Sequence, residues 1–177
     1  VDVADIDSVW LACNGAIYLT NKVYSPTAYI SVSFPALINE TMRILYWGIE
    51  QLQYDVYLNS LNTYYSFFIP TNNSMLEYID PVSYGKSKTQ LYRFYYDKTK
   101  VNKEQRVWAS IWNYDTETGM VLDSVGKTTD VNVIKNRLKD ILETHIVIGN
   151  VEDGRTYYRT KGGTEIRVSN VAAGANG

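Results

Sequence analysis

Hydrophobic residues recur at helical spacing in two parts of the chain. In the first, successive apolar residues are separated by four or three positions, which places them on one face of a helix over residues 38–52. Asn39 is suited to cap its first turn, because its side-chain oxygen can accept a hydrogen bond from an unpaired amide. The residues on this face are Ile38, Met42, Leu45, Ile49 and Leu52.

The second helical pattern follows Asp130, which we expect to be the N-cap of that helix. The pattern consists of Ile134, Leu138, Ile141 and Leu142, which share one helical face. A shorter helix is predicted over residues 56–61. Thr71 or Asn72 is expected to cap a helical turn that follows Pro70, and residues 25–36, which contain two prolines, are read as a connector.

Outside these helices, short runs of β-branched and aromatic residues predict strands. Asn14-Gly15 marks a turn between two such runs near the start of the chain, which indicates a hairpin within residues 1–24. Glycine-containing turns also separate the last strands. The remaining predicted strands cover residues 64–69, 91–96, 106–113, 120–122, 145–149, 156–159 and 165–168. Residues 172–177 are expected to fray. The mixture predicts an α+β fold.

The predicted strand that begins near residue 107 alternates in a way that separates two faces. Trp108, Trp112 and Tyr114 point to one side, and Val107, Ala109 and Ile111 point to the other, which is the better candidate for the core. Together with Tyr92, the first three are our candidate ligand-binding aromatics, because aromatic rings suit a sugar face or a protein partner. The alternative is a second small core beneath an insertion over residues 83–128.

Composition narrows the possible functions. Apolar residues make up 45% of the 177 residues and the net charge is −2, which favours a globular domain and argues against a nucleic-acid binder. Apolar runs are too short to cross a bilayer. Leu11-Ala12-Cys13 resembles a lipidation box, but acidic residues precede it, so Cys13 is expected to be a small buried thiol.

No metal site, cofactor site or catalytic constellation is predicted. The chain has one histidine and one cysteine, and neither lies in a spacing typical of zinc ligands. His145, between an apolar helix and an apolar strand, is expected to be a packed histidine. A hydrolase built around His145 is kept as an alternative, which requires a hydroxyl and a carboxylate near the ring.

Two segments resemble the fasciclin family of extracellular adhesion modules. Residues 66–75, which include Pro70, Thr71 and Asn72, are similar to the first signature of the family, and the stretch from Leu138 through His145 to Gly149 is similar to a second. Thr144 stands where the family usually has a tyrosine before the histidine. The resemblance implies helices packed on a wedge of two β-sheets, with an aromatic hairpin inserted over residues 83–128.

A third segment resembles the closing signature of the same family. Asn14, Gly15 and Tyr18 belong to it, with Tyr18 in the place of a customary histidine. Since this segment ends a domain in the family, we expect a fragment of a tandem protein. Residues 1–26 would be the closing strands of one repeat, 27–36 a linker, and 37–177 a second repeat without its own closing strands. We expect residues 1–24 to supply strands, in cis or to a neighbouring repeat or chain.

The resemblance implies a non-catalytic adhesion or binding module. Residues 83–128 exceed the usual family length, and with their aromatic content they resemble variants in Bacteroidetes envelope proteins. This implies an extracellular or outer-membrane location, with an anchor outside this fragment. Protein or polysaccharide partners at the cell surface are expected, and nucleic acid is not. The second hypothesis is a glycan-binding accessory protein of a bacterial outer-membrane import system that uses Trp108, Trp112 and Tyr114.

Overall fold

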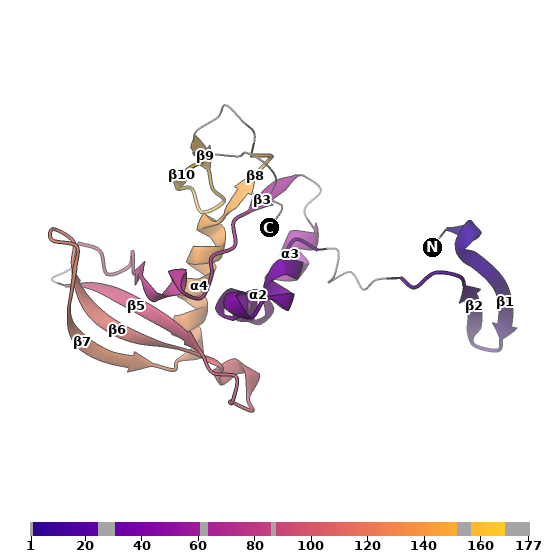
Figure 1. Ribbon diagram of the computed structural model, residues 1–177, viewed down its shortest axis with the longest axis horizontal. Helices are drawn as coiled ribbons and strands as arrows, with labels where there is room; N and C mark the ends of the chain where they lie inside the picture. The colour runs from indigo at the N-terminus through magenta and orange to yellow at the C-terminus, as the bar shows by residue number, and fades with distance from the viewer. Residues whose placement is uncertain (1, 25–30, 61–63, 86–87, 152–156, 169–177) are drawn as a thin grey trace. The chain divides into compact units, whose positions relative to one another are not determined.

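Figure 1 shows the computed structural model, which describes residues 2–24, 31–60, 64–85, 88–151 and 157–168. The chain divides into two compact units, residues 1–31 and 32–177. Both units contain antiparallel strands, and the helices longer than a single 3₁₀ turn are in the second. Helices and strands together give a fold that is broadly α+β.

The first unit is built around a β-hairpin. β1 (Ile6–Ala12) pairs with β2 (Gly15–Thr20), and Ala12 lies opposite Gly15, so the turn falls where Asn14-Gly15 predicts it. Near the open end of the hairpin, the Asp5 carboxylate accepts a hydrogen bond from the Tyr24 hydroxyl at 3.1 Å. Cys13 is exposed, so the expectation of a buried thiol is wrong, because this residue occupies the turn.

Apolar side chains occupy both faces of this hairpin. Val9 and Trp10 are neighbours in β1 and therefore point to opposite faces, yet they are 49% and 53% exposed. Their cross-strand partners, Tyr18 and Ile17, are exposed as well. A strand with apolar residues on both sides is typical of one that is covered on both sides.

The second unit contains four helices and eight strands among its described residues. The helices are α1 (Phe34–Ile38), α2 (Arg43–Gln51), α3 (Tyr54–Ser60) and α4 (Val131–Thr144). The strands are β3 (Tyr65–Phe67), β4 (Tyr78–Ile79), β5 (Thr89–Tyr96), β6 (Val107–Asp115), β7 (Met120–Thr128), β8 (Ile146–Ile148), β9 (Tyr157–Arg159) and β10 (Glu165–Arg167).

A four-stranded antiparallel sheet is the largest element of this unit. Its strand order is β4-β5-β6-β7, so each strand pairs with its neighbour in the sequence. Two further sheets have two strands each: β3 pairs with β8, and β9 pairs with β10. Figure 1 shows α4 running across the strands of the large sheet.

One hydrophobic core joins the helices to the inner face of the large sheet. Phe94 of β5 and Ala109 of β6 are 0% exposed and belong to the same cluster as Ile44 of α2 and Leu138 of α4. Val107 is part of this cluster too. The inner side of these strands, within residues 83–128, therefore contributes to the main core.

The two predicted long helices have different outcomes. α4 begins after Asp130, whose side chain accepts hydrogen bonds from the amides of Asn132 and Val133, as predicted. The helix predicted over residues 38–52 is instead interrupted. Asn39 is extended, with φ −94° and ψ 119°, and its side chain caps a 3₁₀ turn over Glu40–Met42 before α2 begins. α1 starts at Phe34 with Pro35 in its first turn, inside the segment expected to be a connector.

Lysine and tyrosine side chains attach the β9–β10 turn to the helices. Lys161 Nζ lies 2.6 Å from a carboxylate oxygen of Glu143 in α4. The same ammonium group lies 4.9 Å from the centre of the Tyr57 ring and 5.6 Å from that of Tyr54, both in α3. These contacts combine an ion pair with cation–π attraction.

Residues 172–177, which were expected to fray, lie outside the described part of the chain.

Among the described residues, no helix combines the length and the apolar character needed to traverse a bilayer.

Candidate functional site

The outer face of the four-stranded sheet, on the side away from α2 and α4, carries a row of aromatic residues. Trp108 pairs across the strands with Tyr95, and their rings stack with centroids 4.5 Å apart and an interplanar angle of 22°. Trp112 and Tyr114 follow on the same face of β6, as the alternation predicted. All four side chains are partly buried. We call Tyr95, Trp108, Trp112 and Tyr114 the aromatic row.

An arginine completes this face. The guanidinium carbon of Arg93 lies 5.1 Å from the centre of the Trp112 ring, a cation–π distance, and Trp112 Nε1 donates a hydrogen bond to Ser110 Oγ at 3.0 Å. Lys127 of β7 lies opposite Ser110. The sheet face therefore combines flat apolar rings with cationic groups, which is a common composition of binding surfaces.

Tyr92 does not belong to the aromatic row. It pairs with Ile111 on the inner face of the sheet and is 4% exposed, within the main core. Burial raises the pKa of its hydroxyl above the ordinary value, and the nearby Arg137 guanidinium opposes that rise. The prediction that Tyr92 contacts a ligand together with Trp108 is wrong, because Tyr92 and Trp108 lie on opposite faces of the sheet.

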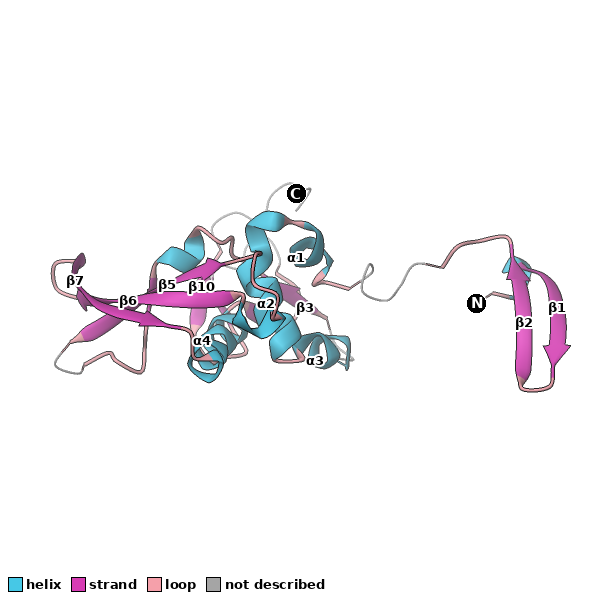
Figure 2. Cartoon of the chain, turned by 90° about the horizontal axis from the view of Figure 1, so that it is seen from below, coloured by secondary structure: helices cyan, strands magenta, loops and turns pink. Residues whose placement is uncertain are grey.

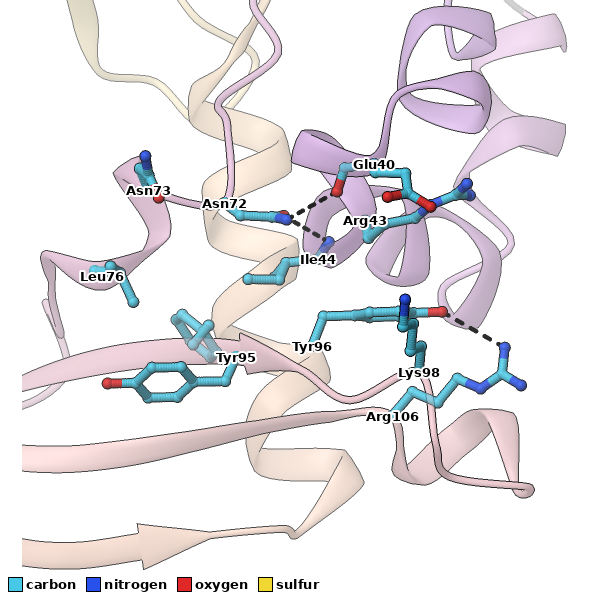
Figure 3. A pocket seen from close by; sticks show the side chains of 11 residues that line it. Glu40, Arg43, Ile44, Asn72, Asn73, Leu76, Tyr95, Tyr96, Lys98 and Arg106 are labelled. Atoms are coloured by element: carbon cyan, nitrogen blue, oxygen red, sulfur yellow. Dashed lines mark hydrogen bonds between the residues drawn. The ribbon is translucent and has the colours of Figure 1, made fainter.

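A pocket of about 580 Å³ opens where the start of α2 meets the end of β5. Its wall includes the cationic side chains of Arg43, Lys98 and Arg106 and a single carboxylate, that of Glu40. Figure 3 shows Tyr96 crossing the pocket, with its hydroxyl directed toward Arg106. The Arg106 Nη1 donates to that hydroxyl at 3.5 Å. We call this cavity the cationic pocket.

Main-chain carbonyls hold two of these cations in place. Arg43 Nη1 donates to the Leu37 carbonyl at 3.0 Å, and Arg106 Nε donates to the Lys100 carbonyl at 2.9 Å. Neither guanidinium forms an ion pair with a described residue, and neither does Lys98, which is exposed. The pocket therefore carries more positive than negative charge, although the chain as a whole is at −2.

Asn72 forms the wall of the pocket and fixes the start of α2. Its side-chain oxygen accepts a hydrogen bond from the Ile44 amide at 3.1 Å, and its side-chain nitrogen donates to the Glu40 carbonyl at 3.0 Å. Both bonds are drawn in Figure 3. The sequence predicted Asn72 or Thr71 as a cap for the turn that follows. Asn72 instead caps a helix that is distant in sequence, which local patterning does not reveal.

Thr71 has a local role. Its hydroxyl lies 3.4 Å from that of Ser74, and its carbonyl accepts a hydrogen bond from the Met75 amide, in a 3₁₀ turn over Ser74–Leu76. The helical turn expected after Pro70 ends at Leu76, and Tyr78 begins β4. Of the sequence neighbours Thr71 and Asn72, Asn72 lines the pocket.

His145 ends α4. Its Nδ1 lies 2.7 Å from the Ile141 carbonyl oxygen, and its main-chain amide donates to the Leu142 carbonyl. The Thr144 hydroxyl lies 3.2 Å from the same Nδ1. The ring is partly buried. The nearby hydroxyl and the helix carbonyl both meet Nδ1, and among the described residues no carboxylate is hydrogen-bonded to the ring.

The other motif residues lie in the first unit. Asn14 is in the hairpin turn, Gly15 begins β2, and Tyr18 pairs with Val9 and is 55% exposed. Together these residues form a turn and one exposed strand face. Within the described part of the chain, no group of three or more histidine, cysteine, aspartate or glutamate residues is arranged to hold a metal ion.

A buried ion pair lies at the far end of the inner sheet face. Asp80, which follows β4, has a side chain that is 2% exposed, and its carboxylate lies 3.0 Å from Arg137 Nη2 of α4. The Arg137 guanidinium also lies 5.3 Å from the centre of the Tyr92 ring. Asp80, Arg137 and Asn113 line a second, smaller cavity. We interpret this arrangement as a structural connection between the sheet and α4.

Sequence reasoning identified Trp108, Trp112 and Tyr114 of the aromatic row, but neither Tyr95 nor the cationic pocket. Arg43, Lys98 and Arg106 belong to three separate segments, and none lies in a recognisable motif. Tyr95 is the residue that both surfaces share, because it stacks on Trp108 and also lines the pocket. The run of aromatic residues at the end of β5 was the one available signal.

Comparisons of the chain with family models, with curated proteins and with solved structures found no match.

Proposed function

We propose that this chain is a non-catalytic adhesion or binding module at a cell surface, which contacts a protein or a glycan. The observation that carries the proposal is the aromatic row on the outer face of the four-stranded sheet. Its rings are partly accessible, and they are held on a regular antiparallel sheet whose opposite face is anchored in the core. A rigid framework of this kind reduces the ordering cost of binding.

The family resemblance supports the location and the class of partner. In the fasciclin-like interpretation, helices pack on a wedge of two sheets, and the module lies outside the cell or on the outer membrane. Thr71 and Asn72 carry the first signature of the resemblance, and Asn72 organises the start of α2. His145, in the second signature, ends α4.

A glycan-binding accessory protein of an outer-membrane import system is the second candidate. The stacked Tyr95 and Trp108 rings favour it, because a sugar ring can pack its C–H face against an aromatic ring. For this candidate the ligand is a saccharide, whereas the leading proposal includes protein partners. A hydrolase built around His145 is less well supported, because its Nδ1 contacts the Ile141 carbonyl.

The hairpin of the first unit supports strand exchange with a neighbouring repeat or chain. Apolar side chains on both of its faces are exposed, and a lone two-stranded hairpin is marginally stable in water. In the described residues, β1 and β2 form ladder pairs with each other. Binding to another sheet would bury the apolar side chain of Val9 on one face or of Trp10 on the other, and this burial would favour the association.

The proposed function is tested with arrays of cell-surface polysaccharides and proteins, probed with the 177-residue chain. We expect that Trp108→Ala reduces binding to the partner found, whereas Trp108→Phe, which keeps a ring to stack on Tyr95, retains most of it. Tyr84→Ala is the control, because Tyr84 is 66% exposed and lies outside the aromatic row. If all three variants bind as the parent does, the aromatic row is not the contact surface.

A further inference from the structure

The cationic pocket has the size and the composition of a ligand site. Its volume of about 580 Å³ lies within the range of roughly 300–1,000 Å³ that is typical of small-molecule sites. Four separate segments of the chain form its wall: the start of α2, the turn after Thr71, the end of β5 and the residue before β6. The hydrogen bonds of Asn72 hold the first two segments together, so this part of the wall is fixed before any ligand arrives.

Charge in the pocket indicates an anionic group. Arg43, Lys98 and Arg106 line it together with one carboxylate, and none of the three cations forms an ion pair with a described residue. Each of the two guanidinium groups donates one hydrogen bond to a main-chain carbonyl, which orients it. Other N–H groups of each guanidinium remain to bind a ligand. Guanidinium and ammonium groups bind carboxylate and sulfate oxygens through charge-assisted hydrogen bonds.

Two tyrosines that line the pocket indicate the chemistry of the rest of the ligand, beyond its anionic group. Tyr96 lies in the pocket beside Arg106, and Tyr95 lines the same pocket while stacking on Trp108. Tyr95 and Tyr96 are neighbours in β5 and point to opposite faces of the sheet, so Tyr96 is the ring that faces the cations while Tyr95 stacks on Trp108. A sugar ring can pack against Tyr96 while its acidic group meets the cations. A single small anion would use the cations alone.

We propose that the cationic pocket binds an acidic saccharide, with the carboxylate or sulfate of one sugar near Arg43, Lys98 and Arg106 and the ring of that sugar against Tyr96. This inference rests on the proposed function and specifies its ligand. Tyr96 provides the ring against which the acidic sugar packs, and its hydroxyl interacts with Arg106.

The test compares four probes by isothermal titration with the full 177-residue chain: an oligogalacturonate, a chondroitin sulfate oligosaccharide, a neutral galactan of the same length, and ATP. We expect at least one acidic saccharide to bind about tenfold or more tightly than the galactan, and added salt to weaken it. Lys98→Gln should weaken this binding about tenfold, and Lys98→Arg should retain it. Lys139→Gln, which removes the same charge from an exposed position of α4, is the matched control.

Lys98 suits the test because its side chain is exposed and the substitution removes no contact of the core. If the galactan binds as tightly as the acidic saccharides and only Trp108→Ala weakens it, the proposed function stands and this inference is wrong. If acidic saccharides depend on Lys98 but not on Trp108, the pocket stands and the aromatic row is not a binding surface. Binding of ATP alone, or of no probe, overturns the assignment to a saccharide.

Discussion

Replacing Arg137 should destabilise the second unit more than any exposed charge would. In Arg137→Met, the Asp80 carboxylate keeps one hydrogen bond, from the Val82 amide at 3.2 Å, and loses its cation at 3.0 Å. Its side chain is 2% exposed, so the carboxylate is poorly solvated once the guanidinium is removed. Removing one partner of a buried pair costs about 3–5 kcal/mol.

The opposite substitution should cost less. Asp80→Asn leaves the charge on Arg137, whose side chain is 18% exposed and can reach water, so we expect a loss of about 1–3 kcal/mol. The double variant Asp80→Asn/Arg137→Met should lose less stability than the two single variants lose in sum, because both charged groups are then absent and no unpaired charge remains. A coupling above about 0.5 kcal/mol is the signature of a direct interaction.

The measurement is urea unfolding followed by far-UV circular dichroism, with a common slope used to compare the variants. Since a stable domain has about 5–15 kcal/mol in total, a loss of the expected size shifts the midpoint clearly. Lys139→Met, on the exposed side of α4, is the control for the helix itself. A cost below about 1 kcal/mol for Arg137→Met, or simple additivity of the two substitutions, would refute the reasoning.

Two further substitutions test the polar contacts of Asn72 and Tyr78. Asn72→Ala removes the acceptor of the Ile44 amide, so unfolding in urea should show a loss of about 1–3 kcal/mol, whereas Asn73→Ala, at an exposed neighbour, should change little. Burial raises the pKa of the Tyr78 hydroxyl, so the unfolded chain releases this proton at a lower pH than the folded chain does. The stability that this shift contributes is fully present below about pH 10 and is lost as the pH rises further, and Tyr78→Phe should make that loss less steep. Unfolding midpoints measured between about pH 9 and 11 decide the point, and equal slopes for both proteins would contradict it.

Much of the regular structure could be predicted from periodicity alone. The Asp130-capped helix, the hairpin turn at Asn14-Gly15 and the alternation around Trp108 all depend on neighbours within a few residues, and local patterns encode such contacts directly. The helix expected over residues 38–52 failed at its start for the same reason. Apolar spacing continued through Asn39, but the extended backbone there separates α1 from the turn that precedes α2.

The features that escaped prediction depend on contacts between distant segments. Asn72 caps α2 across 28 positions, and Arg137 meets Asp80 across 57. The cationic pocket gathers residues from the α2 start and from both ends of the β5–β6 connection. Alternation along β5 shows that Tyr92 and Tyr95 point to different faces of the sheet. Deciding which of them shares a face with Trp108 required the register of β5 against β6, which the sequence does not show.

β7 forms an edge of the four-stranded sheet, and its irregular pairing has a consequence for solubility. The register against β6 shifts twice, between Ile111 and Trp112 and between Trp112 and Tyr114. Met120 and Leu122 of this edge strand are 63% and 52% exposed. A regular edge strand with exposed apolar side chains would favour pairing with a strand of another molecule. Bulges twist an edge out of the straight geometry that a pairing strand needs. The irregular pairing of β7 therefore disfavours self-association of the sheet along this edge, where exposed apolar side chains would otherwise promote it.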